Sequence, residues 1–153
     1  MNRQRGVTLV ELVIAIVIVG IAAAALYTAM ASIGGRSADP LLRQQSLALA
    51  EAYLEEILLQ DFLDPTSGSQ CPSAPASRQA YDNVCDYAGL VDNGARNAYG
   101  ETLAGLGDYR VSVAVTPLAW NGLVASDVLE VLVTVRDPSG QELRLGGYRV
   151  RHD

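Results

Sequence analysis

Few side chains in this sequence have the chemistry of a catalytic or metal site. The only histidine, His152, lies next to the C-terminus, and the only cysteines are Cys71 and Cys85. One histidine and two cysteines cannot supply the general bases and zinc ligands on which many enzymes depend. The adjacent pair Glu55 and Glu56 would point about 100° apart on a helix, so these carboxylates do not converge on one substrate. No phosphate-binding loop or dinucleotide fingerprint occurs. The sequence predicts a protein that is not an enzyme and has no cofactor or metal.

One carboxylate has an unusual setting. Glu11 lies inside the apolar stretch that begins at Val7, and no charged residue occurs from Leu12 to Ile33. As a helix, that uncharged segment would be about 33 Å long, the thickness of the hydrocarbon core of a bilayer. An ionised carboxylate in hydrocarbon costs at least about 2.5–3.5 kcal/mol. Either Glu11 reaches water at the helix end or stays protonated, or it pairs with a positive charge such as a freed N-terminal amine on a neighbouring copy.

The flanking charges predict the orientation of this apolar segment. Arg3 and Arg5 precede it and Arg36 follows it. Two positive charges in a very short N-terminal tail keep that tail in the cytoplasm. We therefore expect residues 7–36 to form a single membrane-spanning helix, with the remainder of the chain outside the cytoplasm.

The first sixteen residues resemble the type IV prepilin signal. Residues 1–6 (MNRQRG) form a short basic leader that ends in glycine, and residues 7–16 (VTLVELVIAI) place Glu11 at the fifth position after it. The resemblance implies that a prepilin peptidase cleaves between Gly6 and Val7 and that the new first residue is N-methylated. The usual first residue of the family is Phe, and Val7 departs from that pattern.

Two other interpretations of the N-terminus compete with the prepilin signal. A plain signal anchor explains the apolar run and its arginines but not Gly6 or Glu11. A cleaved secretory signal peptide would end at residues 29–31, where Ala-Met-Ala forms an A-x-A-like site. The apolar segment before that site is longer than the usual h-region of about 7–15 residues and contains the glutamate.

Residues 37–63 are predicted to form a second, amphipathic part of the N-terminal helix. Asp39 is a good N-cap and Pro40 a good first-turn residue, so the helix is expected to restart or kink here, and Asp64-Pro65 ends it. One half of its circumference is apolar, with Leu42, Leu49, Ala50, Tyr53, Leu54, Ile57 and Leu58. A second, narrow apolar stripe contains Leu41, Ala48, Ala52 and Leu59. The stripe is either tolerated at the surface or contacts neighbouring helices in an assembly.

Residues 64–108 have little periodicity and are expected to be irregular. A disulfide between Cys71 and Cys85 would contribute about 3 kcal/mol by closing the loop between them; two free thiols are the alternative. Scattered acids and amides also occur here, namely Asp82, Asn83, Asp86, Asp92, Asn93, Asn97 and Glu101. They are interpreted either as turn residues or as oxygen ligands for calcium, although their spacing matches no EF-hand loop.

From residue 109 to residue 153 the period of the apolar residues changes to two. Valines alternate with small residues from Val111 to Val115, a second apolar run covers 128–135, and residues 141–151 follow the turn at 137–140. This pattern predicts an antiparallel meander. The fold class is therefore α+β, with a long N-terminal helix packed on a three- to four-stranded antiparallel sheet, as in pilins.

Shorter strings resemble one subgroup of pilin-like proteins. Residues 45–57 with 64–65, residues 81–90, and Tyr148-Arg149 are similar to the minor pilins of mannose-sensitive haemagglutinin (MSHA) pili, the MshD group. Minor pseudopilins of type II secretion share the signal and the layout and are the second interpretation. A periplasmic binding domain or enzyme on a simple anchor is a remote third. Cys85 departs from the MSHA subgroup, in which this position is more often another residue.

The MSHA resemblance implies a location and a set of partners. The protein would lie in the bacterial inner membrane with a periplasmic C-terminal domain, and would enter the pilus after assembly. Its partners would be the prepilin peptidase, other major and minor pilins and the inner-membrane assembly platform. Nucleic acid is not among them, because 17 acidic residues outnumber 11 basic ones.

Overall fold

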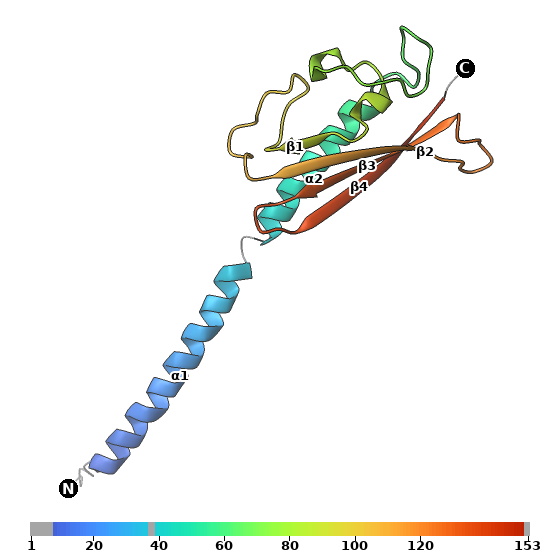
Figure 1. Ribbon diagram of the computed structural model, residues 1–153. Helices are drawn as coiled ribbons and strands as arrows, with labels where there is room; N and C mark the ends of the chain where they lie inside the picture. The colour runs from blue at the N-terminus through green and yellow to red at the C-terminus, as the bar shows by residue number, and fades with distance from the viewer. Residues whose placement is uncertain (1–7, 37–38, 152–153) are drawn as a thin grey trace. The chain divides into compact units, whose positions relative to one another are not determined.

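The computed structural model describes residues 8–36 and 39–151 of the chain (Figure 1). The chain divides into two compact units, residues 1–41 and 42–153. In the first unit the described residues form helix α1 (Leu9–Arg36) and the start of helix α2 (Asp39–Leu58). Alanine, isoleucine, valine and leucine make up most of α1 and no proline interrupts it, so an unbroken helix can form. The predicted apolar helix is therefore present.

Helix α2 ends at Leu58, before the boundary at residue 63 that the sequence predicts. The reason lies in the backbone that follows the helix. The amide of Asp61 donates to the carbonyl of Asp82 (3.4 Å), and the amide of Val84 donates to the carbonyl of Asp61 (3.0 Å). This short pairing with a distant segment turns the chain away from the helix axis and brings Phe62 into the core.

The sheet has four antiparallel strands in the order β1-β2-β3-β4. Their bounds are Val91–Asn93, Arg110–Pro117, Val128–Arg136 and Glu142–Val150. The α+β fold class is confirmed, with the strand number at the upper end of the expected range. Strand β1 lies in the region expected to be irregular, together with two short 3₁₀ helices, η1 (Arg78–Ala80) and η2 (Val84–Tyr87). Its three residues are too few to show a period of two.

Alternate residues of the strands form the core beneath α2. Val113, Val133 and Leu145 lie side by side in the register of three adjacent strands. Figure 1 shows α2 lying along one face of the sheet. The residues that α2 buries there belong to its predicted apolar half: Leu49, Ala50, Tyr53 and Ile57 are buried, and Leu42, Leu54 and Leu58 are partly buried. Each large apolar side chain contributes about 1.5–3 kcal/mol by leaving water.

A glycine of the sheet lies directly against α2. A Cβ atom on Gly147 of β4 would lie 3.1 Å from Leu58 Cδ1 and 3.3 Å from Leu54 Cδ1. The neighbouring Gly146 has more room, since its Cβ would lie 3.7 Å from the nearest heavy atom, the carbonyl oxygen of Val131. The absence of a side chain at residue 147 thus sets the distance between helix and sheet.

We predict that Gly147→Val lowers the free energy of unfolding by about 1–3 kcal/mol, because it overpacks the contact with α2. The measurement is the urea midpoint of the full chain in detergent. Gly146→Val is the matched control and should change stability by no more than about 0.5 kcal/mol. Equal losses in the two variants would contradict this account of the packing.

Candidate functional site

Most of the surface of α1 is left uncovered by the residues that the structure describes. Residues 8–30 are all exposed, although this segment consists almost entirely of large and small apolar side chains. Its segment Leu9–Met30 has a mean hydropathy of 2.8 and is long enough to cross a membrane. An apolar surface of this size is stable only when lipid or other apolar helices cover it.

Glu11 lies in the first turn of this apolar helix. Its amide donates to the hydroxyl Oγ1 of Thr8 (3.4 Å), and the amide of Leu12 donates to the Thr8 carbonyl (3.1 Å). Thr8 therefore caps the helix, with Glu11 at the third helical position. The spacing Thr-x-x-Glu is a recognisable capping sequence, and it could have predicted that the helix starts at Thr8.

The carboxylate of Glu11 is available to an external partner. Among the residues that the structure describes, it has no hydrogen bond and no ion pair, and it is exposed. Its position near the helix N-terminus is favourable for a negative charge because of the helix dipole. Two of the predicted processing residues, Gly6 and Val7, lie outside the described residues, as does His152.

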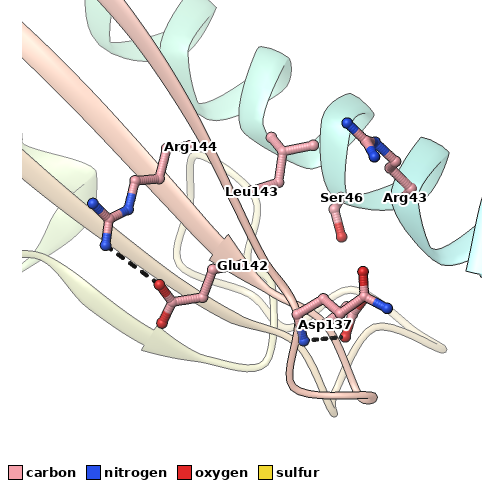
Figure 2. Close-up of a pocket in the computed structure, with 7 residues that line it drawn as sticks. Arg43, Ser46, Asp137, Glu142, Leu143 and Arg144 are labelled. Carbon is pink, nitrogen blue, oxygen red and sulfur yellow. Dashed lines mark hydrogen bonds and ion pairs between the residues drawn. The ribbon is translucent and has the colours of Figure 1, made fainter.

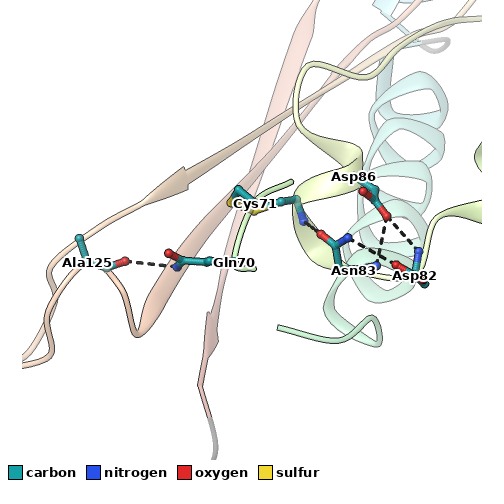
Figure 3. Close-up of a disulfide and its surroundings, with 7 residues drawn as sticks. Gln70, Cys71, Asp82, Asn83, Asp86 and Ala125 are labelled. Carbon is teal, nitrogen blue, oxygen red and sulfur yellow. Dashed lines mark hydrogen bonds between the residues drawn. A yellow bond between two sulfur atoms is a disulfide. The ribbon is translucent and has the colours of Figure 1, made fainter. Parts of the chain in front are cut away.

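The predicted disulfide between Cys71 and Cys85 is confirmed (Figure 3). Cys85 is buried in η2, which begins with a capping box: the amide of Cys85 donates to Asn83 Oδ1 (2.9 Å), and the amide of Asn83 donates to Asp86 Oδ2 (3.3 Å). Cys71 is exposed. The disulfide thus joins an exposed loop to a residue fixed in the core.

The structure distributes the candidate calcium ligands over several hydrogen-bonding roles. Asn83 and Asp86 cap η2, and the side-chain amide of Asn97 donates to the Glu101 carboxylate (2.9 Å). Asp92 belongs to a separate ionic network, described next. Within residues 8–36 and 39–151, no group of three acidic, histidine or cysteine side chains is arranged to hold a metal ion. Asn83, Asp86, Asn97 and Glu101 therefore serve loop structure.

A largely buried arginine connects three segments of the second unit. Arg78 lies inside the loop that the disulfide closes, and its guanidinium contacts Glu56 of α2 (3.1 Å) and Asp92 of β1 (2.6 Å). The side chains of Arg78, Glu56 and Asp92 are 7%, 16% and 8% exposed. Low exposure strengthens these interactions and makes the loss of one partner costly. We call this set, Arg78, Glu56 and Asp92, the arginine clamp.

Two tyrosines complete the surroundings of the clamp. The Tyr53 hydroxyl donates to Asp92 Oδ2 (2.8 Å) and accepts from the amide of Arg96 (2.8 Å), and the Tyr87 hydroxyl donates to Glu56 Oε1 (2.8 Å). Burial raises the pKa of Tyr53 to about 12 and also raises the pKa of Tyr87, with the hydrogen bond to Glu56 adding to it. Both hydroxyls therefore remain protonated donors at neutral pH. The Arg78 guanidinium lies 4.9 Å from the centre of the Tyr53 ring.

Sequence reasoning missed the arginine clamp. Glu56 is recognisable only as one of two adjacent glutamates, and Arg78 is 22 residues further along the chain in a region without periodicity. The clamp residues make their contacts with one another, so the arrangement holds α2 to the disulfide loop and β1. The contacts within the clamp give it a structural role.

The similarity of this chain to a known protein family lies at its N-terminus. Residues 1–27 match the family model of the prokaryotic N-terminal methylation motif. No curated protein and no solved structure matches the chain. The motif supports a type IV pilin-like or pseudopilin subunit, a class that is generally structural, and it implies processing by prepilin peptidase. Together with the exposed apolar helix it supports membrane anchoring.

We predict that Arg78→Met lowers the free energy of unfolding, because Glu56 and Asp92 lose a buried partner. The expected loss is near the lower end of the range of about 3–5 kcal/mol. Arg144→Met is the matched control, since it breaks an exposed ion pair with Glu142 and should cost about 0–1 kcal/mol. Urea unfolding of the oxidised full-length protein measures both. A cost for Arg78→Met no greater than that for Arg144→Met would show that the clamp does not contribute to stability.

Proposed function

We propose that this protein is a minor pilin-like subunit of a type IV pilus of the MSHA type, with a structural or assembly-initiating role. The match of residues 1–27 to the methylation motif carries the proposal. It is supported by the uncovered apolar surface of α1, which requires lipid before assembly and other helices after it. In this function the chain crosses the inner membrane once and later enters the pilus.

A periplasmic location of the second unit fits its disulfide. Disulfides form and persist in the bacterial periplasm and are rare in the cytosol. The bond between Cys71 and Cys85 closes the loop that contains Arg78. Arginines 3 and 5 before the apolar helix favour the same orientation, with the N-terminus in the cytoplasm.

The free carboxylate of Glu11 supplies a mechanism for assembly. Cleavage after Gly6 gives Val7 a positively charged amine, which is N-methylated in the proposed mature subunit. Where helices pack side by side with an axial offset, the amine of one subunit approaches Glu11 of another. Attraction between these charges is strong in a low dielectric, whereas either charge alone is costly there. The pair therefore favours correctly staggered subunits, and it forms only after processing.

The assignment to the MSHA type rests on the shorter strings of similarity. These strings include Tyr53 and Glu56 on α2 and Tyr87 on η2, which surround Arg78. The residues that resemble the MSHA minor pilins are thus residues that hold the second unit together. Cross-linking in cells that express MSHA assembly proteins tests the assignment: adducts with MSHA pilins or their assembly platform are expected, and adducts with type II secretion components alone would overturn it.

Processing provides the first test of the pilin function. Gly6→Leu should leave the leader attached, because the proposed peptidase site requires a small residue at this position. Gly20→Leu is the control, since Gly20 lies within α1 with nothing within 4 Å of its Cβ position. N-terminal sequencing should begin at Val7 in the parent and the control. A chain that begins at Ser32 would instead indicate a secreted soluble protein.

Assembly provides the second test. Glu11→Gln should leave membrane insertion and leader removal intact but reduce incorporation into pili or tip complexes by about tenfold or more, a loss of 1.4 kcal/mol or more per pairing. The measurement is the amount of subunit in sheared fibres and in cross-linked inner-membrane complexes. Glu51→Gln, an exposed change on α2, serves as the control. Normal incorporation of the Glu11→Gln variant would exclude charge pairing as the mechanism.

A further inference from the structure

The two cysteines of the disulfide differ in their surroundings. Cys85 is 4% exposed and lies in η2, where Val84, Asp86 and Tyr87 are also buried. Cys71 is exposed and lies in a loop outside the helices and strands of the described chain. Another molecule can therefore approach Cys71 more easily than Cys85.

Contacts other than the disulfide fix Cys85 in its buried position. The Val84 side chain is fully buried, and the Val84 amide donates to the carbonyl of Asp61 (3.0 Å). Tyr87, at the other end of η2, is buried, and its hydroxyl donates to Glu56 Oε1 (2.8 Å). The capping box of η2 adds a local constraint. None of these contacts needs the sulfur–sulfur bond, so we expect Cys85 to be buried before that bond forms.

The loop around Cys71 has few attachments to the rest of the second unit. Residues 65–77 contain no charged side chain. In the described part of the chain, no backbone hydrogen bond joins residues 71–76 to another residue. The side-chain amide of the neighbouring Gln70 donates to the carbonyl of Ala125 (3.3 Å; Figure 3). The loop can therefore present Cys71 to the active site of another protein without breaking a helix or a strand.

We propose that a periplasmic thiol–disulfide oxidoreductase oxidises the folded second unit through Cys71, and that Cys85 is the resolving cysteine. The proposal rests on the periplasmic location proposed above. Thiol–disulfide exchange depends on access to the sulfur atoms. A close-packed core leaves no room for a second protein beside Cys85. The mixed disulfide with the partner therefore forms at Cys71.

The exchange proceeds in two balanced steps. The Cys71 thiolate attacks the disulfide of the oxidised partner, bonds to one of its sulfurs and releases the other as a thiolate. The Cys85 thiolate then attacks Cys71 Sγ, forms the disulfide within this chain and expels the remaining partner sulfur as a thiolate. Two thiols of this chain are oxidised and the partner's disulfide is reduced to a dithiol. The two protons from the thiols of this chain pass to the partner's thiolates.

The first step can be measured with glutathione disulfide as the oxidant. Cys85→Ala and Cys71→Ala each leave one thiol in the full-length protein, which is kept in detergent. Mass spectrometry should show the glutathione adduct forming at least about tenfold faster in Cys85→Ala than in Cys71→Ala, because a buried thiol reacts only in molecules that open locally. In concentrated urea the two rates should converge. A smaller ratio in detergent alone, or an unchanged ratio in urea, would overturn the proposal.

Trapping in cells tests the partner. A tagged periplasmic thiol oxidase of the thioredoxin fold is co-expressed with each variant, and adducts that a reducing agent releases are measured on gels. Cys85→Ala should accumulate the mixed disulfide because the resolving cysteine is missing, whereas Cys71→Ala should not. Equal adducts in both variants would show that the unfolded chain is oxidised instead. Absence of an adduct with Cys85→Ala would exclude this partner, and either result overturns the proposal.

The two experiments also separate this proposal from the pilin function. The glutathione rates depend on the fold of the second unit and not on processing or assembly. Normal leader removal with equal glutathione rates would therefore overturn the role of Cys71 alone. A chain that is not processed at Gly6 but shows the expected rates would instead contradict the pilin function.

Discussion

Residues 9–30 of α1 form an apolar surface that the described part of the chain leaves uncovered, and the rest of the molecule is organised around this constraint. These exposed apolar residues are stable only in an environment such as lipid or other apolar helices. In lipid, a helix satisfies its backbone hydrogen bonds internally, which is why a long unbroken helix is the form that such a segment takes. The second unit, in turn, must build a complete core from residues 42–153 alone.

That second core depends on two kinds of cross-connection. Apolar residues of α2 and of the strands bury one face of the sheet, as the alternation of Val131, Val133 and Val135 requires. The region between helix and sheet lacks such a pattern, and there covalent and ionic contacts take over. The disulfide and the arginine clamp hold this region to α2 and β1, so a segment with little apolar periodicity still has one conformation.

Apolar packing leaves a periodic pattern in the sequence, whereas the ionic contacts of the clamp do not. This difference decides which parts of the fold could be predicted from the sequence. The long apolar helix, the buried half of α2, strands β2 to β4 and the disulfide all leave periodic or compositional signals. The clamp does not, because Arg78 finds Glu56 and Asp92 only after the loop has folded. Likewise, the end of α2 at Leu58 is set by pairing of Asp61 with the backbone near Asn83, a contact that no local pattern reveals. At the N-terminus, the chemistry of Glu11 could be recognised, while its capping partner Thr8 was overlooked.

That capping partner has a consequence for the maturation of the subunit. The residue that starts α1 is Thr8, which lies after the proposed cleavage point rather than in the leader. Under the proposed processing, the helix would keep its own starting residue, and loss of residues 1–6 would expose a new amine while Thr8 still caps the turn that contains Glu11. The unfavourable nucleation of a new first turn would therefore not be needed between the cut and the first encounter with a neighbouring subunit.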